Sequence, residues 1–182
     1  MVYSLSRARD TMAGNVIVSY SDILYEPRVL KAVMDSPHDI AVATDRRWLK
    51  LWRQRFNDPL SDAESLILTA DGSIAEIGAK AVDLSSIQGQ FTGLMKFSNT
   101  GLAALTKALD EGEKAAPLRG RNFTKMYMTD MLQGLIDSGV AVHPAWIDGG
   151  WFEVDSLHDL KLAKALMVPA ENATAGKFVI NF

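Results

Sequence analysis

Two aspartates stand just past predicted strands, where a carboxylate could take part in chemistry. Asp22 follows the run NVIVSY, and Asp155 follows the extended stretch WFEV. Ligands of open α/β sheets bind at the carboxyl ends of strands, and two carboxylates brought together there would repel each other unless a cation lay between them. Mg²⁺ takes oxygen ligands, commonly one or two carboxylates plus substrate phosphates. The pair therefore predicts a Mg²⁺ site for phosphoryl-type chemistry, although spacing alone favours the alternative that each aspartate caps the turn or helix after it.

Strands and helices alternate along the chain, and these elements must position the two aspartates. Uninterrupted β-branched runs are typical of strands covered on both faces of a sheet, and the Asp71-Gly72 turn predicts a hairpin. The alternation predicts one α/β domain over residues 1–182, a sandwich around a mostly parallel sheet with a small hairpin insertion. The expected strands are 15–20, 40–44, 65–68, 73–77, 89–97, 140–147 and 151–154, the expected helices are 26–36, 98–110, 124–138 and 157–167, and 46–56 is helical or irregular.

Composition narrows the class of protein. The net charge of −3 and the pI near 5.6 give no electrostatic basis for binding a polyanion, so we expect no nucleic-acid partner. The absence of cysteine excludes disulfides, thiolate zinc sites and a cysteine nucleophile. No apolar run approaches the roughly 18 residues that cross a bilayer, and MVYSLSRARD lacks a signal-peptide core. We therefore expect a cytoplasmic protein with no membrane partner.

Six segments resemble a known family and occur in its order. They are VSYSDILYEPRVL, DIAVATDRRW, EIGAK, GQFTGLMKFS, YMTDMLQGLIDSG and DGGWFEVDSLHDL. Over about residues 1–166 the chain resembles nucleotidyltransferases, most closely the sugar-phosphate, phosphocholine and aminoalkylphosphonate cytidylyltransferases. The resemblance implies a three-layer, Rossmann-like nucleotide-diphospho transferase fold, with Mg²⁺ held by Asp22 and Asp155. It is this resemblance, and not the spacing, that favours the metal site over two caps.

The resemblance also implies a reaction. An oxygen of a phosphate or phosphonate acceptor attacks the α-phosphorus of a nucleoside triphosphate, with CTP favoured, and pyrophosphate leaves. Lys80, in EIGAK, aligns with a family lysine that contacts the acceptor's phosphate. The expected catalytic residues are thus Asp22, Lys80 and Asp155, while Lys80 could equally be a solvated lysine after the hairpin.

Aromatic residues are candidates for the walls of an acceptor pocket. The candidates are Trp48, Trp52, Tyr127 and Trp151, and aromatic faces attract an ammonium headgroup by about 0.5 to 2 kcal/mol each. Trp48 and Trp52 are also spaced at i and i+4, which is typical of an apolar stripe on a helix. Trp151 has the stronger position because it follows the Asp-Gly-Gly turn and precedes Asp155.

Two further acidic residues could contact the acceptor or the metal. Glu153 alternates with Asp155 along the same extended stretch, so the two share a face. Glu153 could be a second metal ligand or could bind an amine. Asp45 ends a predicted strand and is a candidate acceptor contact.

One family feature is missing from this sequence. The Gly-rich loop that wraps the triphosphate has no counterpart here, and the chain matches the C-terminal two-thirds of the family. We therefore expect a domain that lacks the first strands of the family fold, with exposed sheet edge that could promote self-association. The alternative function is an inactive or accessory fragment that binds the acceptor.

Overall fold

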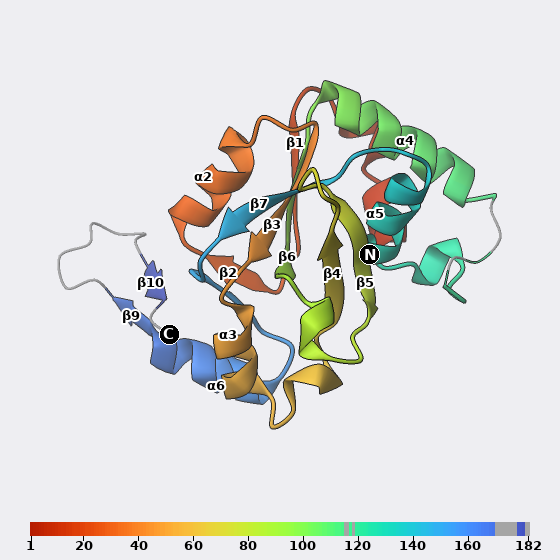
Figure 1. Cartoon of the computed structure of the whole chain (residues 1–182). Helices are drawn as coiled ribbons and strands as arrows, with labels where there is room; N and C mark the ends of the chain where they lie inside the picture. The colour runs from red at the N-terminus through yellow and green to blue at the C-terminus, as the bar shows by residue number, and fades with distance from the viewer. Residues whose placement is uncertain (115–116, 118, 170–177, 181–182) are drawn as a thin grey trace.

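The computed structural model describes residues 1–114, 117, 119–169 and 178–180. Its central sheet has four strands in the order β1–β6–β3–β7, shown in Figure 1. These are β1 (Val16–Ser19), β6 (Gln90–Phe97), β3 (Ile40–Asp45) and β7 (His143–Ile147). The predicted α/β sandwich is confirmed.

The direction of the strands differs from the prediction. β6 runs antiparallel to both β1 and β3, and in the described part of the chain only β7 runs parallel to its neighbour, β3. The expectation of a mostly parallel sheet is therefore wrong. After β3 the chain makes a hairpin excursion and re-enters the sheet at the same end, with Gln90 opposite Asp45. A return at the same end gives an antiparallel pair, whereas a crossover would have given a parallel one.

β1 was predicted to be a buried strand, and this too is wrong. Its residues alternate between partly buried and exposed, and Ile17 is 37% exposed. The strand lies at the edge of the four-stranded sheet, so one of its sides has no partner strand among the described residues. β3, by contrast, is buried along its whole length, as predicted.

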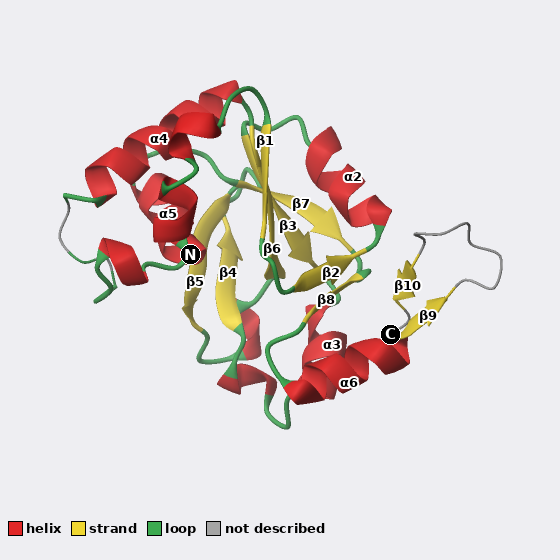
Figure 2. Cartoon of the chain, turned by 180° about the vertical axis from the view of Figure 1, so that it is seen from behind, coloured by secondary structure: helices red, strands yellow, loops and turns green. Residues whose placement is uncertain are grey.

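Helices cover both faces of the sheet, which makes the three layers. Successive residues of β3 point to opposite faces: Ile40 and Val42 join one hydrophobic cluster, and Ala41 and Ala43 join the other. Figure 2 shows α2 on one side of the sheet and α4 with α5 on the other. The helices are α1 (Val2–Ser6), α2 (Pro27–Asp35), α3 (Trp48–Arg55), α4 (Asn99–Gly112), α5 (Met128–Asp137) and α6 (Leu157–Leu166), and short 3₁₀ turns span Arg9–Thr11, Pro59–Ser61, Leu84–Ser86 and Phe123–Lys125.

Local signals explain where several helices begin. Pro27 occupies the first turn of α2, where its missing N–H costs nothing. The hydroxyl of Ser98 accepts the Gly101 N–H at 3.2 Å and so caps α4. The predicted helix at 124–138 begins later than expected, at Met128, because residues 123–125 form a separate 3₁₀ turn.

Three small antiparallel pairs lie outside the central sheet in the described part of the chain. The predicted hairpin is confirmed as β4 (Glu64–Leu68) and β5 (Ile74–Lys80), joined through the Asp71-Gly72 turn. β2 (Ile23–Tyr25) pairs with β8 (Trp151–Glu153), and we call this pair the β2–β8 ribbon. A third pair joins β9 (Met167–Pro169) to β10 (Phe178–Ile180). None of the helices in the described ranges has the length and apolar character to span a membrane.

Candidate active site

The β2–β8 ribbon brings Asp22 and Asp155 to the same place. Ile23 is paired with Glu153, and one step further the Val154 N–H donates to the Asp22 carbonyl at 2.9 Å. Asp22 and Asp155 therefore flank one end of the ribbon, although 133 positions separate them in the sequence. This is the convergence on which the predicted metal site depends.

The carboxyl group of Glu153 is influenced by the negative charges of both Asp155 and Asp22. Burial raises its pKa to about 7, the charge of Asp155 acts in the same direction, and Asp22 adds a smaller contribution. The guanidinium of Arg55 opposes the shift. The end of the ribbon is thus a place of concentrated negative charge.

A cavity of about 330 Å³ opens beside the ribbon, and we call it the acidic cavity. Four carboxyl side chains line it, Asp62, Glu64, Glu153 and Asp155, and no lysine, arginine or histidine is among its described lining residues. Asp22 lines an adjoining hollow that shares Met1 and Tyr20 with it. The remaining lining residues are Met1, Tyr20, Trp52, Gln90, Phe91, Gly93, Tyr127 and Thr129.

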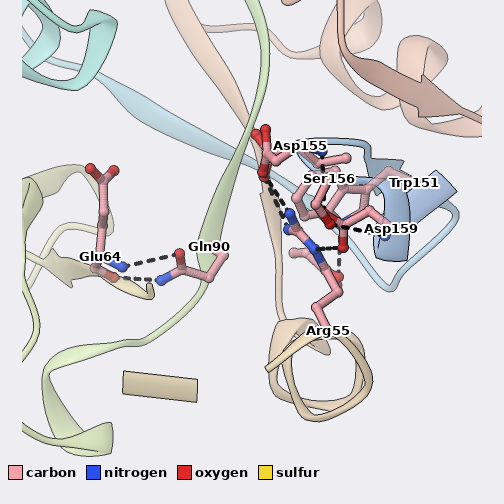
Figure 3. A network of polar contacts seen from close by, with 9 residues as sticks. Arg55, Glu64, Gln90, Trp151, Asp155, Ser156 and Asp159 are labelled. Atoms are coloured by element: carbon pink, nitrogen blue, oxygen red, sulfur yellow. Dashed lines mark hydrogen bonds and ion pairs between the residues drawn. The ribbon is translucent and has the colours of Figure 1, made fainter. Parts of the chain in front are cut away.

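Two acidic residues of the cavity, Asp62 and Glu64, were not predicted, whereas Trp52 was a candidate pocket residue and does line it. Asp62 and Glu64 lie at the start of β4, and burial raises the pKa of each carboxyl. Gln90 bonds the backbone of Glu64 on both sides, through its Oε1 to the N–H at 3.3 Å and through its Nε2 to the carbonyl at 2.5 Å, as Figure 3 shows. The Glu64 carboxylate is thereby presented to the cavity. The buried N–H of Trp52 makes no hydrogen bond of ordinary geometry, but it lies close enough to Asp62 to lower the pKa of that carboxyl.

Arg55 was also missed, and it lies behind the acidic cavity. Its side chain is fully buried and makes ion pairs with three carboxylates: Asp155 at 2.6 Å, Asp159 at 3.0 Å and Glu153 at 3.1 Å. Figure 3 shows it reaching from α3 towards Asp155 and Asp159. A signal for it existed in the sequence, since Arg55 continues the buried helical stripe of Trp48, Leu51 and Trp52.

Three predicted acceptor contacts belong to the core instead. Trp48 is 5% exposed and packs edge-on against Trp52, and Trp151 is 1% exposed. Asp45 is 1% exposed, and its carboxylate accepts the Trp151 Nε1–H at 2.9 Å and the N–H groups of Arg47 and Gly149, each at 2.8 Å. With these bonds made, Asp45 has a structural role, and neither it nor either tryptophan is among the residues that line the acidic cavity.

Tyr127 and Lys80 are exposed. Tyr127 lines the acidic cavity at the start of α5, with the Arg121 guanidinium 4.3 Å from the centre of its ring. Lys80 ends β5 in register with Glu64, and it is not among the lining residues of the cavity. The structure therefore places Tyr127 and Glu153 with Asp155 at the cavity, and Lys80 beyond its wall.

The carboxylates at the end of the ribbon fit a Mg²⁺ site in which the protein supplies only one or two ligands. Among the described residues no group of three or more acidic or histidine side chains is arranged to hold a metal ion. Asp22 and Asp155 offer carboxylate oxygens, and one or two carboxylates are what Mg²⁺ commonly takes when phosphates complete its shell.

The chain is similar in sequence to a curated cytidylyltransferase. No family model matches it. The chain is 34% identical over 168 residues to a CTP:phosphoglutamine cytidylyltransferase of Campylobacter jejuni. The aligned region covers 89% of this chain and 66% of that relative. The chain thus spans just under two thirds of the curated relative that it matches.

Two solved structures share the fold. An inositol-1-phosphate CTP transferase from T. maritima has a TM-score of 0.61 at 18% identity, covering 86% of this chain and 56% of that one. A CTP:phosphocholine cytidylyltransferase from Streptococcus pneumoniae has a TM-score of 0.61 at 19% identity, covering 91% and 63%. At this identity the likeness concerns the fold alone, which is that of nucleotidyltransferases. In sequence the chain is similar to a cytidylyltransferase over most of its own length.

Proposed function

We propose that this chain serves Mg²⁺-dependent cytidylyl transfer from CTP to a small acceptor that carries a phosphate or phosphonate, with release of pyrophosphate. The observation that carries the proposal is the meeting of Asp22 and Asp155 at the end of the β2–β8 ribbon, beside the acidic cavity. The relationship to a CTP-dependent transferase supports the choice of nucleotide. The same relationship does not favour the alternative function, an accessory fragment without activity.

The chemistry that this arrangement must perform is an in-line displacement. An acceptor oxygen forms a bond to the α-phosphorus of CTP, the bond from that phosphorus to the bridging oxygen breaks, and pyrophosphate leaves with the electron pair. Asp22 and Asp155 would hold Mg²⁺, which supplies neutralisation of the phosphate charge when bound. The walls of the cavity would hold the acceptor oxygen in line, and such positioning is most of what a protein contributes to this reaction.

The acceptor's other end has a recognisable chemistry. Because four carboxyl side chains and no described basic side chain line the cavity, a positively charged group would suit it, and we include an amine in the proposed acceptor. Asp62 and Glu64 would accept its N–H bonds, and the rings of Trp52 and Tyr127 would add cation–π attraction. Lys80, in register with Glu64, is the proposed contact for the acceptor's phosphate.

Calorimetric titration of the purified chain with CTP in Mg²⁺ tests the transferase proposal. We expect saturable heat for the unmodified chain and its loss in Asp22→Ala. Asp148→Ala removes an exposed acid on the turn before β8 and is the matched control, which should bind as the unmodified chain does. Equal binding by Asp22→Ala and Asp148→Ala, or no heat at all, would overturn the proposal.

Pyrophosphate release with paired acceptors tests the amine. Phosphoethanolamine and 2-hydroxyethyl phosphate differ only in the replacement of the ammonium by a hydroxyl. We expect kcat/KM to be at least about tenfold higher for the amine, since a buried carboxylate strongly prefers a charged donor. Glu64→Gln should shrink that preference. Equal rates for the two acceptors would exclude the amine while leaving the transferase proposal intact.

A further inference from the structure

Arg55 ties together three elements at the rear of the acidic cavity. It comes from α3, and its partners lie at the end of β8, just beyond it, and in the first turn of α6. Glu153 and Asp155 line the cavity, whereas Asp159, which is 4% exposed, does not. The guanidinium therefore contacts the cavity's carboxylates from the protein side, where no substrate reaches it.

Each nitrogen of the guanidinium is assigned to a different carboxylate. Nε donates to Asp159, Nη1 to Glu153 and Nη2 to Asp155. The group is also packed against aromatic rings, with its central carbon 5.3 Å from the ring centre of Trp52 and 5.0 Å from that of Phe56. Because the fork is planar and packed against these rings, the direction of each N–H fixes the direction of one carboxylate.

Asp159 extends this hold to the backbone of Asp155. Its Oδ1 accepts from Arg55, while its Oδ2 accepts the Ser156 hydroxyl at 2.8 Å and the Asp155 N–H at 3.3 Å. Asp155 is thus fixed twice, at its carboxylate by Arg55 and at its N–H by Asp159. Its side chain is nevertheless half exposed, so the carboxylate keeps a side open to a cation.

The charges at the ribbon do not balance. Three carboxylates share one guanidinium, and Asp22 adds a fourth close by. Arg55 can hold these groups together against their mutual repulsion. Its single positive charge does not neutralise all of the carboxylates, so the site keeps a net negative charge.

From this geometry we propose that Arg55 is the positioning residue of the site: it holds Asp155 and Glu153 towards the acidic cavity in an arrangement that leaves excess negative charge for a cation. Only the identity of that cation rests on the proposed function. The positioning itself rests on the contacts above and can be tested without metal.

Arg55→Lys is the informative variant, because it keeps the charge and loses the fork. A lysine ammonium cannot aim three donors at three carboxylates in the directions that the guanidinium fixes. Leu109→Ala is the control for lost stability, since Leu109 is fully buried in α4 and does not line the cavity. Hydrogen exchange, followed by NMR on the full chain, measures the backbone amides, and titration with Mn²⁺ measures binding of a divalent cation.

We expect exchange of the Val154, Asp155 and Asp159 amides to quicken about tenfold in Arg55→Lys, with the amides of β3 unchanged. Mn²⁺ should bind at least about tenfold more weakly, as is usual when the partner of a metal ligand is removed. Leu109→Ala should leave Mn²⁺ binding unchanged. Faster exchange spread evenly over the molecule, or Mn²⁺ affinity equal to that of the unmodified chain, would overturn the inference. If the unmodified chain binds no Mn²⁺, the metal in the proposed function fails, and the exchange measurement still decides the role of Arg55.

Discussion

Asp45 and Asp155 are both aspartates that follow strand residues, and their surroundings give them opposite roles. Asp45 accepts three N–H groups and is 1% exposed, so its carboxylate is engaged by the protein and closed to a ligand from solvent. Asp155 is half exposed, and its side chain is paired with a single guanidinium. The number of surrounding donors and the exposure of the side chain therefore separate the structural carboxylate of Asp45 from the carboxylate of Asp155, which we propose as a metal ligand.

Asp45→Asn should lower the free energy of unfolding by about 2–4 kcal/mol. An amide offers one acceptor oxygen where the carboxylate has two, so at least one buried N–H loses its partner. Urea denaturation measures the loss. The exposed neighbour Asp148→Asn is the control and should change stability by less than about 0.5 kcal/mol. A cost below about 1 kcal/mol for Asp45→Asn would show that the three bonds are not what holds the Asp-Gly-Gly turn.

Glu153 should make stability depend on pH near neutrality. Its pKa is raised to about 7 from an ordinary value of 4.5, first by burial and then by Asp155. The folded chain therefore holds this proton more tightly than the unfolded chain does. The stabilisation is fully present below about pH 4.5, declines as pH rises, and is lost above about pH 7.

The measurement is the free energy of unfolding between pH 5 and 8, for the unmodified chain and for Glu153→Gln. Across this window we expect the unmodified chain to lose about 1–3 kcal/mol more than the variant, because the glutamine does not titrate. Parallel curves for the two proteins would mean that Glu153 titrates at its ordinary pKa.

At the scale of elements, the β4–β5 hairpin reaches the site by docking on α5. Gln133 of α5 accepts the Ile77 N–H at 2.9 Å and donates to the Ala75 carbonyl at 3.3 Å. Gly78 then passes directly over Thr129, which lines the acidic cavity. A Cβ on Gly78 would lie 2.2 Å from the Cβ of Thr129, and its φ of +75° already disfavours any side chain.

Gly78→Ala should therefore cost about 3 kcal/mol or more, from strain in φ together with the collision with Thr129. Gly72→Ala is a matched control in the same hairpin. Its φ of +85° is equally strained, but nothing lies within 4 Å of the added Cβ, so only about 1 kcal/mol should be lost. Thermal denaturation compares the two, and equal losses would show that the hairpin does not press on α5.

Element positions were predictable where the signal was local. Pro27, Ser98 and the Asp71-Gly72 turn each fix a start or a turn through contacts within a few residues, and the helices expected at 26–36 and 98–110 and the hairpin are found there. The direction of β6 was not predictable in that way, since it depends on the path of the hairpin excursion between β3 and β6. The edge position of β1 likewise depends on which strands pair, and not on its own residues.

The candidate site also divides into residues with a local sequence signal and residues that depend on distant contacts. Asp22, Glu153 and Asp155 could be proposed from the sequence because strand ends and family motifs can be seen in it, and the structure places them at one end of the β2–β8 ribbon. Arg55 contacts partners 98 to 104 positions away, so no local pattern pairs them. Trp48 and Trp151 were assigned to a pocket because the residue types that line pockets also fill cores, and only burial separates the two.

At the scale of the whole molecule, two hydrophobic clusters share one sheet. β3 contributes Ile40 and Val42 to one cluster and Ala41 and Ala43 to the other, so neither cluster can lose its sheet face without the other. This coupling predicts that the two layers of helices unfold together.

Leu105→Ala and Leu51→Ala test this coupling from opposite clusters. Leu105 is 0% exposed in the cluster of α4 and α5, and Leu51 is 1% exposed in the cluster of α2 and α3. Each should cost about 2–4 kcal/mol and should shift one and the same calorimetric transition. A second transition appearing in either variant would show two independently folding halves.

The central claim of the account is that Asp22 and Asp155 act together on one divalent cation. Paramagnetic broadening by Mn²⁺ of the backbone amide signals of the full chain measures this most directly. We predict broadening centred on residues 21–23 and 153–156 and abolished by Asp155→Asn. Broadening centred elsewhere, or unchanged by that substitution, would contradict the claim.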